Sequence, residues 1–441
     1  MQRLFWKNYT SFYFIGIGGV SMSALAKFML AEGKIVGGSD NVSSIYTEEL
    51  HNLGANVEIG KNKGSVSGYD IIIYTDAVSE SDLQLSEARK CGKIIISRGQ
   101  FLYEVSRAFK KVIGISGCHG KTTCVSMLAH IFSVCGKRFC AHIGGRDKTF
   151  CNFYYDGNDY FLTEACEYKK NFLLLKPDIS VILNSGSDHL ECYGSEEKLR
   201  EAYFTFAKSG SNCVSSYSDL GVDSITFGFD NNADFSAHEI ICDNGFYSFS
   251  VLDGAVYLGK IKLNVYGKHN ILNALAAIAV ARIFGFPFDK IAKGLGDFFG
   301  VERRFEYLGK FNGAKCIADY AHHPDEIAAA VQTADTVLKG RLFVIFQPHT
   351  YSRTKNLFSE FTETLSCIKN LLIYRTFAAR EYFDDKGSAL TLSQALPNAC
   401  YGDCPEDIVD FLKKIDKNDL VLFLGAGDIY DIAKSIISGN N

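Results

Sequence analysis

Short apolar runs alternate with amphipathic stretches through the first hundred residues of the chain. Four runs rich in apolar residues predict buried strands at residues 11–19, 34–40, 69–78 and 93–99. Residues 21–33, between the first two runs, have the length and spacing of a helix. Strands that alternate with helices in this way indicate a parallel, doubly wound sheet.

The alternation resumes twice further along the chain. More strands are predicted at residues 111–116, 159–165 and 178–184, and a third set at residues 315–321, 341–349, 371–376 and 419–428. From about residue 198 to residue 268, short aromatic and β-branched runs broken by Gly and Asn predict an antiparallel subsheet added to the central region. We therefore predict an α/β protein of three domains, each built on a mainly parallel sheet flanked by helices. The predicted domains are residues 1–105, 106–300 and 301–441.

Composition narrows the class of protein. The chain has 441 residues and a formal net charge of −4, which argues against a nucleic-acid-binding surface built on excess basic charge. The 14 cysteines include no CxxC pair, so we expect free thiols in a reducing cytoplasm and no structural zinc. The first residues lack the apolar core of a signal peptide, and we expect no stable membrane insertion.

A glycine-rich loop follows the predicted strand at residues 111–116 and precedes an apolar helical stretch. Such a loop presents backbone N–H groups and a helix N-terminus to nucleotide phosphates. Lys121 is expected to reach the β- and γ-phosphates, and the Thr122 hydroxyl to bind Mg²⁺. The spacing differs from the usual P-loop because Ile115 stands where glycine is expected, and the alternative is an ordinary strand-to-helix turn. We predict a P-loop ATPase-like central domain whose loop binds ATP through Gly117, Cys118, His119, Gly120, Lys121, Thr122 and Thr123.

A second glycine-rich loop lies at the end of the first predicted strand. It resembles a dinucleotide-binding turn, with Asp40 near the ~20-residue separation expected of a ribose-binding acid. A nicotinamide dehydrogenase and a UDP-sugar site would look alike here, and a purely structural turn is a further reading. The ATP loop downstream favours the UDP-sugar, because a dehydrogenase does not need it. The predicted UDP-substrate residues are Gly16, Gly18, Gly19, Val20, Ser21 and Asp40.

Motifs along nearly the whole chain resemble those of the Mur ligases, in particular the members that add L-alanine. The matching runs, in order, are GIGGVSMSALA, GCHGKTTC, TEACEY, NSGSDHLECYG, GKHNILNALAA, GVERRFE, DYAHHPDE, FQPHTYSRT and LGAGDIYDIA. This chain departs from the family pattern at two positions. Ser21 replaces a usual glycine, and Cys166 replaces a common Asp.

The resemblance implies an ATP-dependent ligase that joins UDP-N-acetylmuramate to L-alanine through an acyl phosphate, for peptidoglycan synthesis. It implies ATP contacts from Asn270, Asn273, Arg304 and Asp319, with Asn273 at the adenine and Asp319 at the ribose. It assigns the metal to Thr122, Glu164 and His189. It places catalytic roles on Lys121, His322 and Arg353, and contacts to the amino acid or acyl phosphate on Tyr320, His349 and Arg353. ATP and Mg²⁺ are the implied cofactors, and the protein is expected to be a cytoplasmic monomer or homodimer.

Other readings remain open at this point. The first alternative is a ligase that recycles murein tripeptide onto the same UDP-sugar, since it shares the ATP site. Some relatives carry a carbamylated lysine that would fall near Tyr203 and Phe204, and the absence of a lysine there agrees with the alanine-adding type. A non-catalytic descendant would be expected to have lost Lys121, Thr122, Glu164 or His189, and all four are present.

Overall fold

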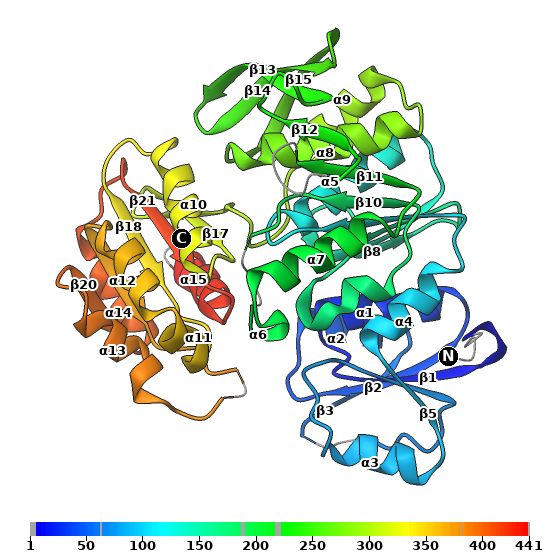
Figure 1. Cartoon of the computed structure of the whole chain (residues 1–441). Helices are drawn as coiled ribbons and strands as arrows, with labels where there is room; N and C mark the ends of the chain where they lie inside the picture. The colour runs from blue at the N-terminus through cyan, green and yellow to red at the C-terminus, as the bar shows by residue number, and fades with distance from the viewer. Residues whose placement is uncertain (1–5, 62–63, 187–189, 217–221, 380, 440–441) are drawn as a thin grey trace. The chain divides into compact units, whose positions relative to one another are not determined.

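The computed structural model describes the chain except residues 1–5, 62–63, 187–189, 217–221, 380 and 440–441. Among the described residues the strands form three sheets, as Figure 1 shows. Contacts divide the chain into two compact units. The larger holds residues 1–240, 248–264 and 269–299, and the smaller holds residues 241–247, 265–268 and 300–441. Within the described part of the chain, no helix is both long and apolar enough to cross a bilayer.

The N-terminal sheet is parallel, with strand order β3-β2-β1-β4-β5. Its strands are β1 (Ser11–Ile15), β2 (Ile35–Asp40), β3 (Asn56–Ile59), β4 (Ile71–Tyr74) and β5 (Ile94–Ser97). Its helices are α1 (Val20–Ala31), α2 (Ile45–Asn52), α3 (Leu83–Lys90) and α4 (Arg98–Ser106). Side chains alternate between the two faces of a strand. Phe12 and Phe14 therefore join the core with α1 and α4, whereas Tyr13 and Ile15 pack toward α3.

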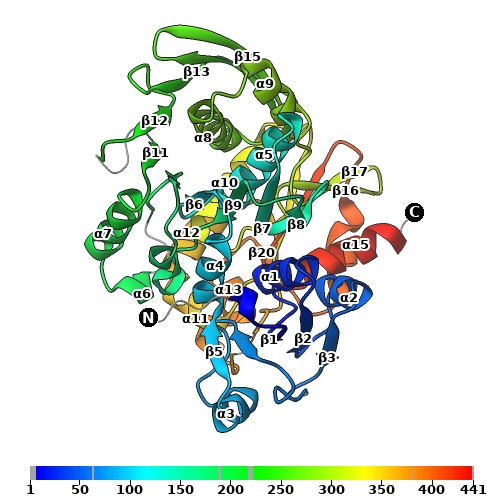
Figure 2. The ribbon, with the colours of Figure 1, turned by 90° about the vertical axis from the view of Figure 1, so that its right-hand side faces the viewer.

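The central sheet has the order β15-β14-β13-β12-β11-β10-β6-β9-β7-β8. Its strands are β6 (Lys111–Ser116), β7 (Phe139–Asp147), β8 (Cys151–Tyr155), β9 (Tyr160–Glu164), β10 (Ile179–Ile182), β11 (Asn212–Ser216), β12 (Ile225–Gly228), β13 (Phe235–Asp243), β14 (Phe246–Asp253) and β15 (Val256–Tyr266). Its helices are α5 (Lys121–Val134), α6 (Leu190–Tyr193), α7 (Glu196–Ala207), α8 (His269–Ile283) and α9 (Phe288–Gly296). Helix α5 packs against α8 and α9, as Figure 2 shows.

The added antiparallel strands β13, β14 and β15 begin later in the chain than the sequence pattern predicted, and a separate antiparallel pair joins β7 and β8. Residues 196–207 form helix α7, and β11 and β12 still pair in parallel. The amphipathic spacing of α7 explains the difference, because Leu199, Tyr203 and Phe206 lie on one buried face. Two-residue connections join β13, β14 and β15, so these strands run antiparallel.

The C-terminal sheet has the order β16-β17-β21-β18-β19-β20, and only the β16–β17 pair is antiparallel. Its strands are β16 (Glu306–Phe311), β17 (Ala314–Asp319), β18 (Leu342–Phe346), β19 (Asn370–Tyr374), β20 (Ala399–Gly402) and β21 (Leu420–Leu424). Its helices are α10 (Pro324–Asp335), α11 (Tyr351–Asn356), α12 (Phe358–Ser366), α13 (Ala389–Gln394), α14 (Pro405–Phe411) and α15 (Ile429–Gly439). Alternate strand residues pack under α10, α12 and α13 on one face and under α14 and α15 on the other. The predicted fold class is confirmed, while the exact domain boundaries stay a prediction.

Candidate active site

The ATP loop lies between the end of β6 and the start of α5, as its sequence predicted. Gly117 and Gly120 have φ values of +136° and +85°, a region that L side chains rarely adopt. A side chain at Gly120 would also collide with Asn273 Oδ1. The loop therefore needs glycine at both positions, and Lys121 becomes the first residue of the helix. This placement directs the first amides of α5 toward a bound anion.

Lys121 is half-buried at this loop and forms an ion pair with buried Glu167. Its Nζ lies 2.9 Å from Glu167 Oε1 and also donates to the carbonyl oxygens of Gly117 and Cys118. Burial lowers the pKa of Lys121, but the charge of Glu167, with smaller contributions from Cys166 and Glu164, raises it above its ordinary value overall. The lysine is therefore positively charged at any physiological pH. Phosphate oxygens entering the loop would compete with Glu167 for its protons.

Hard oxygen ligands gather beside the lysine. Thr122 is buried at the second position of α5, and Thr123 follows it half-buried. Glu164 ends β9, the strand next to β6, and its Oε1 accepts a 2.9 Å hydrogen bond from Gly144 N. The predicted metal ligand His189 lies outside the described residues. Among the described residues no group of three or more His, Cys, Asp and Glu side chains is clustered as metal ligands.

Two asparagines at the start of α8 complete the surroundings of the loop. Asn270 and Asn273 are both buried, and Asn273 Nδ2 donates to Asn270 Oδ1 over 2.9 Å. The close approach of Asn273 to Gly120 places it beside the phosphate loop. On the other side, Asn184 accepts from His119 N and donates to His119 O, both at 3.1 Å. These contacts hold the loop at its exposed residue, His119.

The N-terminal loop joins β1 to α1 in the same unit. Gly16 has a φ of +83° and Gly19 is the N-cap residue of α1, so Val20 and Ser21 are the first two helical residues. Gly18 N donates to Asp40 Oδ2 over 2.9 Å. The acid predicted to bind ribose therefore lies at the loop. The Ser21 side chain bonds to His142 of the central sheet at 2.9 Å.

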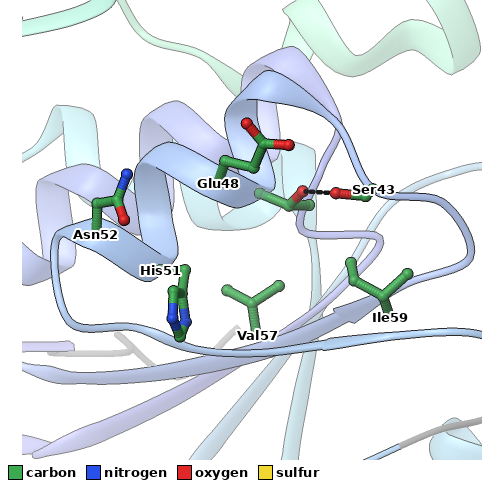
Figure 3. Close-up of a pocket in the computed structure, with 7 residues that line it drawn as sticks. Ser43, Glu48, His51, Asn52, Val57 and Ile59 are labelled. Carbon is green, nitrogen blue, oxygen red and sulfur yellow. Dashed lines mark hydrogen bonds between the residues drawn. The ribbon is translucent and has the colours of Figure 1, made fainter.

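A pocket of about 370 Å³ lies next to this loop, between α2 and the edge strand β3 (Figure 3). Its lining residues are Ser43, Thr47, Glu48, His51, Asn52, Val57 and Ile59. Thr47 connects it with the loop, because its Cγ2 would lie 3.0 Å from a Cβ placed on Gly18. The pocket combines apolar side chains with amide, imidazole, hydroxyl and carboxylate groups, a combination suited to a heterocyclic base or a sugar.

In the smaller unit, Asp319 ends β17, at the carboxyl edge where open α/β sheets bind ligands. Its two oxygens accept hydrogen bonds from Phe305 N at 2.7 Å and Ala321 N at 2.8 Å. Burial raises the pKa of Asp319 to about 6, although the positive charge of Arg304 opposes that rise. The Arg304 guanidinium lies over the Tyr320 ring, 5.4 Å from its centroid.

His322 follows Asp319 closely and has a defined tautomer. Its Nδ1 lies 2.9 Å from the carbonyl oxygen of Tyr320, which can only accept, so Nδ1 carries the proton. Nε2 is therefore an acceptor. Burial lowers the pKa of His322, the charge of Glu326 opposes this, and the charge of Arg353 adds to the lowering.

His349 and Arg353 form the second part of this cluster. Arg353 Nη1 lies 3.1 Å from His349 Nδ1, and a guanidinium can only donate, so His349 carries its proton on Nε2. Burial, His322 and Arg353 lower the pKa of His349 to about 4, so the ring is neutral. The two imidazole centroids are 5.8 Å apart, and Phe377 stacks on His349 at 5.5 Å. The cluster combines one fixed cation with two neutral histidines.

The structure adds residues that sequence reasoning did not select. Glu167 pairs with the loop lysine, Asn184 clamps His119, and Glu326 accepts from His322 N at 3.0 Å. Each lies within a motif already quoted for the family resemblance or directly beside one. Their types alone gave no signal, because their role depends on contacts between distant segments.

Comparison with known proteins agrees with this arrangement. Residues 11–110 match the model described as Mur ligase family, catalytic domain; residues 115–281 match the Mur ligase middle domain; and residues 303–427 match the Mur ligase, glutamate ligase domain. The chain is 39% identical to the UDP-N-acetylmuramate–L-alanine ligase of Clostridium novyi, with 98% of each chain covered.

Solved structures give the same result. The UDP-N-acetylmuramate–alanine ligase of Thermotoga maritima matches with a TM-score of 0.85 and 27% identity, over 98% of this chain and 99% of that one. A murein peptide ligase from Psychrobacter arcticus matches with a TM-score of 0.73 and 21% identity, over 97% and 98%, which shows a shared fold. The chain therefore belongs to the Mur ligase family, whose members use ATP. Within that family it groups with the UDP-N-acetylmuramate–L-alanine ligases, and the murein peptide ligases are more distant.

Proposed function

We propose that this protein uses ATP to join L-alanine to UDP-N-acetylmuramate in peptidoglycan precursor synthesis. The observation that carries the proposal is the paired arrangement in the larger unit. A lysine-bearing phosphate loop at α5 and a second anion-binding turn at α1 belong to the same compact unit. An ATP-dependent ligase that acts on a UDP-sugar needs one site for each phosphate chain.

Activation of the sugar's carboxylate is the first chemical requirement, because an amide does not form readily from a carboxylate and an amine in water. Transfer of the γ-phosphoryl group of ATP to the carboxylate oxygen gives an acyl phosphate and ADP. Two anions must approach for this transfer, so positive charge at the loop lowers the barrier. Lys121 supplies a permanent charge, and the first amides of α5 add partial positive charge.

The donor set beside the loop fits Mg²⁺. A hydroxyl and a carboxylate, from Thr122 and Glu164, are the hard oxygen ligands that this ion prefers. We assign His189 as a further ligand from the family resemblance. A bound Mg²⁺ would neutralise phosphate charge during the transfer. Gly144 N donates to one oxygen of Glu164 and so fixes the orientation of the carboxylate. The other oxygen can then bind the ion.

The nucleotides can be assigned to particular surroundings. We place the UDP diphosphate at the Gly16–Ser21 turn, the uridine in the pocket between α2 and β3, and its ribose near Asp40. For ATP we place the adenine near Asn270 and Asn273, whose amides can read a base edge. Asp319 is assigned to the ATP ribose, and Arg304 to a phosphate.

The smaller unit supplies the groups that an amino acid needs. Arg353 suits the alanine carboxylate, because its planar fork can donate to both oxygens. The unprotonated Nε2 of His322 can take a proton from the alanine ammonium group, which makes the amine nucleophilic. The Nε2 proton of His349 can then donate to an oxygen of the acyl phosphate or of its tetrahedral adduct. The carbonyl oxygen of Tyr320 accepts the Nδ1 proton of His322 and so orients that ring.

Phosphate release provides the test. We expect release from ATP only when UDP-N-acetylmuramate and L-alanine are both present, with a loss of several orders of magnitude in Lys121→Ala. Murein tripeptide in place of L-alanine separates this function from that of the recycling ligase. Tripeptide turnover above that of L-alanine would favour the recycling function, and near-normal turnover by Lys121→Ala would overturn the site. Because both nucleotide substrates are made inside the cell, we place the enzyme in the cytoplasm, as a monomer or homodimer.

A further inference from the structure

Ser21, the second residue of α1, contacts the central sheet through its hydroxyl. Its Oγ lies 2.9 Å from Nε2 of His142, a histidine in β7 whose exposed fraction is only 4%. Helix α1 packs against β7 and β8. Asn152 of β8 adds to this contact, since its Nδ2 donates to Val20 O and to Ser23 Oγ, both at 2.8 Å. The first turn of α1 is thus attached to the central sheet at two points.

The partners of Thr163 give one assignment of the donors and acceptors around His142. We assign the hydroxyl proton of Thr163 to the carbonyl oxygen of Glu164, 3.1 Å away. With that assignment, the bond of 3.0 Å between Thr163 Oγ1 and His142 Nδ1 uses the Nδ1 proton. Nε2 is left as an acceptor, so the Ser21 hydroxyl donates to it. Burial and the nearby charge of Arg98 lower the pKa of His142 to about 4, which agrees with a neutral ring.

Arg98 lies at the outer end of this chain of bonds. Its Nη1 donates to Ser21 Oγ over 3.5 Å, and its Nη2 lies 3.7 Å from Asp76 Oδ2. Because the Ser21 proton is directed at His142, the Ser21 oxygen presents lone pairs to Arg98. The bonds therefore run in one direction, from Arg98 through Ser21, His142 and Thr163 to the backbone of Glu164.

We propose that Ser21 and His142 are positioning residues for the UDP-sugar, because their bond sets the place of the α1 amides relative to the strand that carries Glu164. This inference rests on the proposed function. The reacting carboxylate of a UDP-sugar is held through its distant diphosphate, so a small displacement of the diphosphate turn moves the carboxylate away from the metal site.

Substitution of Ser21 tests the proposal directly. Ser21→Ala removes the hydroxyl and keeps a residue that favours helix. Loss of one neutral hydrogen bond that leaves a buried acceptor unpaired is expected to raise the KM for UDP-N-acetylmuramate about tenfold. The KM values for ATP and L-alanine should stay within about twofold of wild type, since their proposed sites do not include α1. Ser21→Thr keeps the hydroxyl, so its KM for UDP-N-acetylmuramate should match that of wild type.

Two further variants separate positioning from simple loss of stability. Ser106→Ala is the matched control, because Ser106 is also buried in this unit and, among the described residues, its hydroxyl donates to the carbonyl oxygen of Tyr103 in its own helix. We expect its KM values to match wild type. His142→Asn should keep a donor for Thr163 but fail to reach Ser21. Adding Ser21→Ala to it should therefore raise the KM no further.

A spectroscopic measurement completes the test. In ¹⁵N-histidine NMR spectra, we expect His142 as the Nδ1-protonated tautomer, with the Nε2 resonance shifted by Ser21→Ala. An unchanged KM for the UDP-sugar in Ser21→Ala, or an equal rise in the KM for ATP, would overturn the positioning role. Wild-type protein that turns over no UDP-N-acetylmuramate would instead overturn the proposed function, so the two failures are distinguishable.

Discussion

Ionisation of Asp319 should lower the free energy of unfolding, and a single substitution can test this. The Asp319 carboxylate is partly buried at the end of β17, where two backbone N–H groups donate to it. Asp319→Asn keeps the shape and one acceptor, and it removes the charge. The variant loses one of these two hydrogen bonds at every pH, because its amide nitrogen cannot accept, whereas the cost of burying the charge depends on pH. The pH dependence therefore separates the two effects.

The magnitude follows from the raised pKa. A shift from 3.8 to about 6 corresponds to about 3 kcal/mol, at ~1.4 kcal/mol per pKa unit. The sign is destabilising, because the unfolded chain ionises more readily than the folded one. The cost is absent well below pH 4, grows as the pH rises toward 6, and is complete above it. Relative to wild type, Asp319→Asn should gain about 2 kcal/mol between pH 4.5 and pH 7.5.

Hydrogen–deuterium exchange of peptides from β17 and β21 is the suitable assay. The only tryptophan, Trp6, lies in the larger unit, so its fluorescence does not report on this sheet. Parallel stability curves for wild type and Asp319→Asn across this pH range would refute the reasoning. The affinity for ATP should fall although stability rises, since Asp319→Asn removes the charged acceptor for the ribose. We expect its dissociation constant, measured by calorimetry at pH 7.5, to rise about tenfold.

Three further substitutions test the remaining site and its support. Glu164→Gln keeps an acceptor for Gly144 N, so the protein should fold but need on the order of ten times more Mg²⁺ for half-maximal activity. Arg353→Lys should raise the KM for L-alanine about thirtyfold, because an ammonium cannot donate a bidentate pair; unchanged affinity would remove Arg353 from the site. Glu49→Gln leaves buried Lys27 without its 2.6 Å carboxylate partner and should destabilise the larger unit by about 3 kcal/mol. Urea unfolding followed by Trp6 fluorescence would detect it, and an unchanged midpoint would contradict it.

Elements with continuous apolar character were predictable from sequence. The strand expected at residues 111–116 coincides with β6, and the glycine loop, Lys121 and the following helix lie in the predicted order. Local rules suffice there, because a buried parallel strand is apolar on both faces and a phosphate loop needs glycine.

Strand β7 was not predicted, because polar residues and a pair of glycines interrupt its apolar run. His142 and Arg146 interrupt the pattern that marks a buried strand. Residues of α1 and α2 satisfy both polar side chains, since His142 bonds to Ser21 and Arg146 pairs with Glu49. Tertiary partners satisfied these polar groups, and a single segment of sequence does not contain that information.

The candidate site shows the same difference between what local sequence predicts and what tertiary contacts determine. Residue types and spacing were enough to nominate Lys121, and the family resemblance nominated Asp319 and His349, but neither predicted their charge states. The neutral form of His349 depends first on its burial, and then on the charges of His322 and Arg353. The partner of Lys121 is Glu167, 46 residues later. Protonation is decided by these contacts, so it could only be read from the folded chain.

A comparison of Asp147, which is buried, with Asp319, which is half-buried, shows how energetics distinguish a structural carboxylate from a ligand-binding one. Asp147 accepts from Ser126 Oγ, His130 Nε2, Thr149 N and Phe150 N, and these donors outweigh burial and lower its pKa. Asp319 is bonded, within the described residues, to two backbone amides, and its pKa is raised. A carboxylate has room for about four hydrogen bonds. Asp147 is saturated and can only hold the fold together. Asp319 has unused acceptor capacity at the ligand-binding edge of its sheet, and hydroxyl groups of a bound ribose would supply the donors that folding alone leaves out.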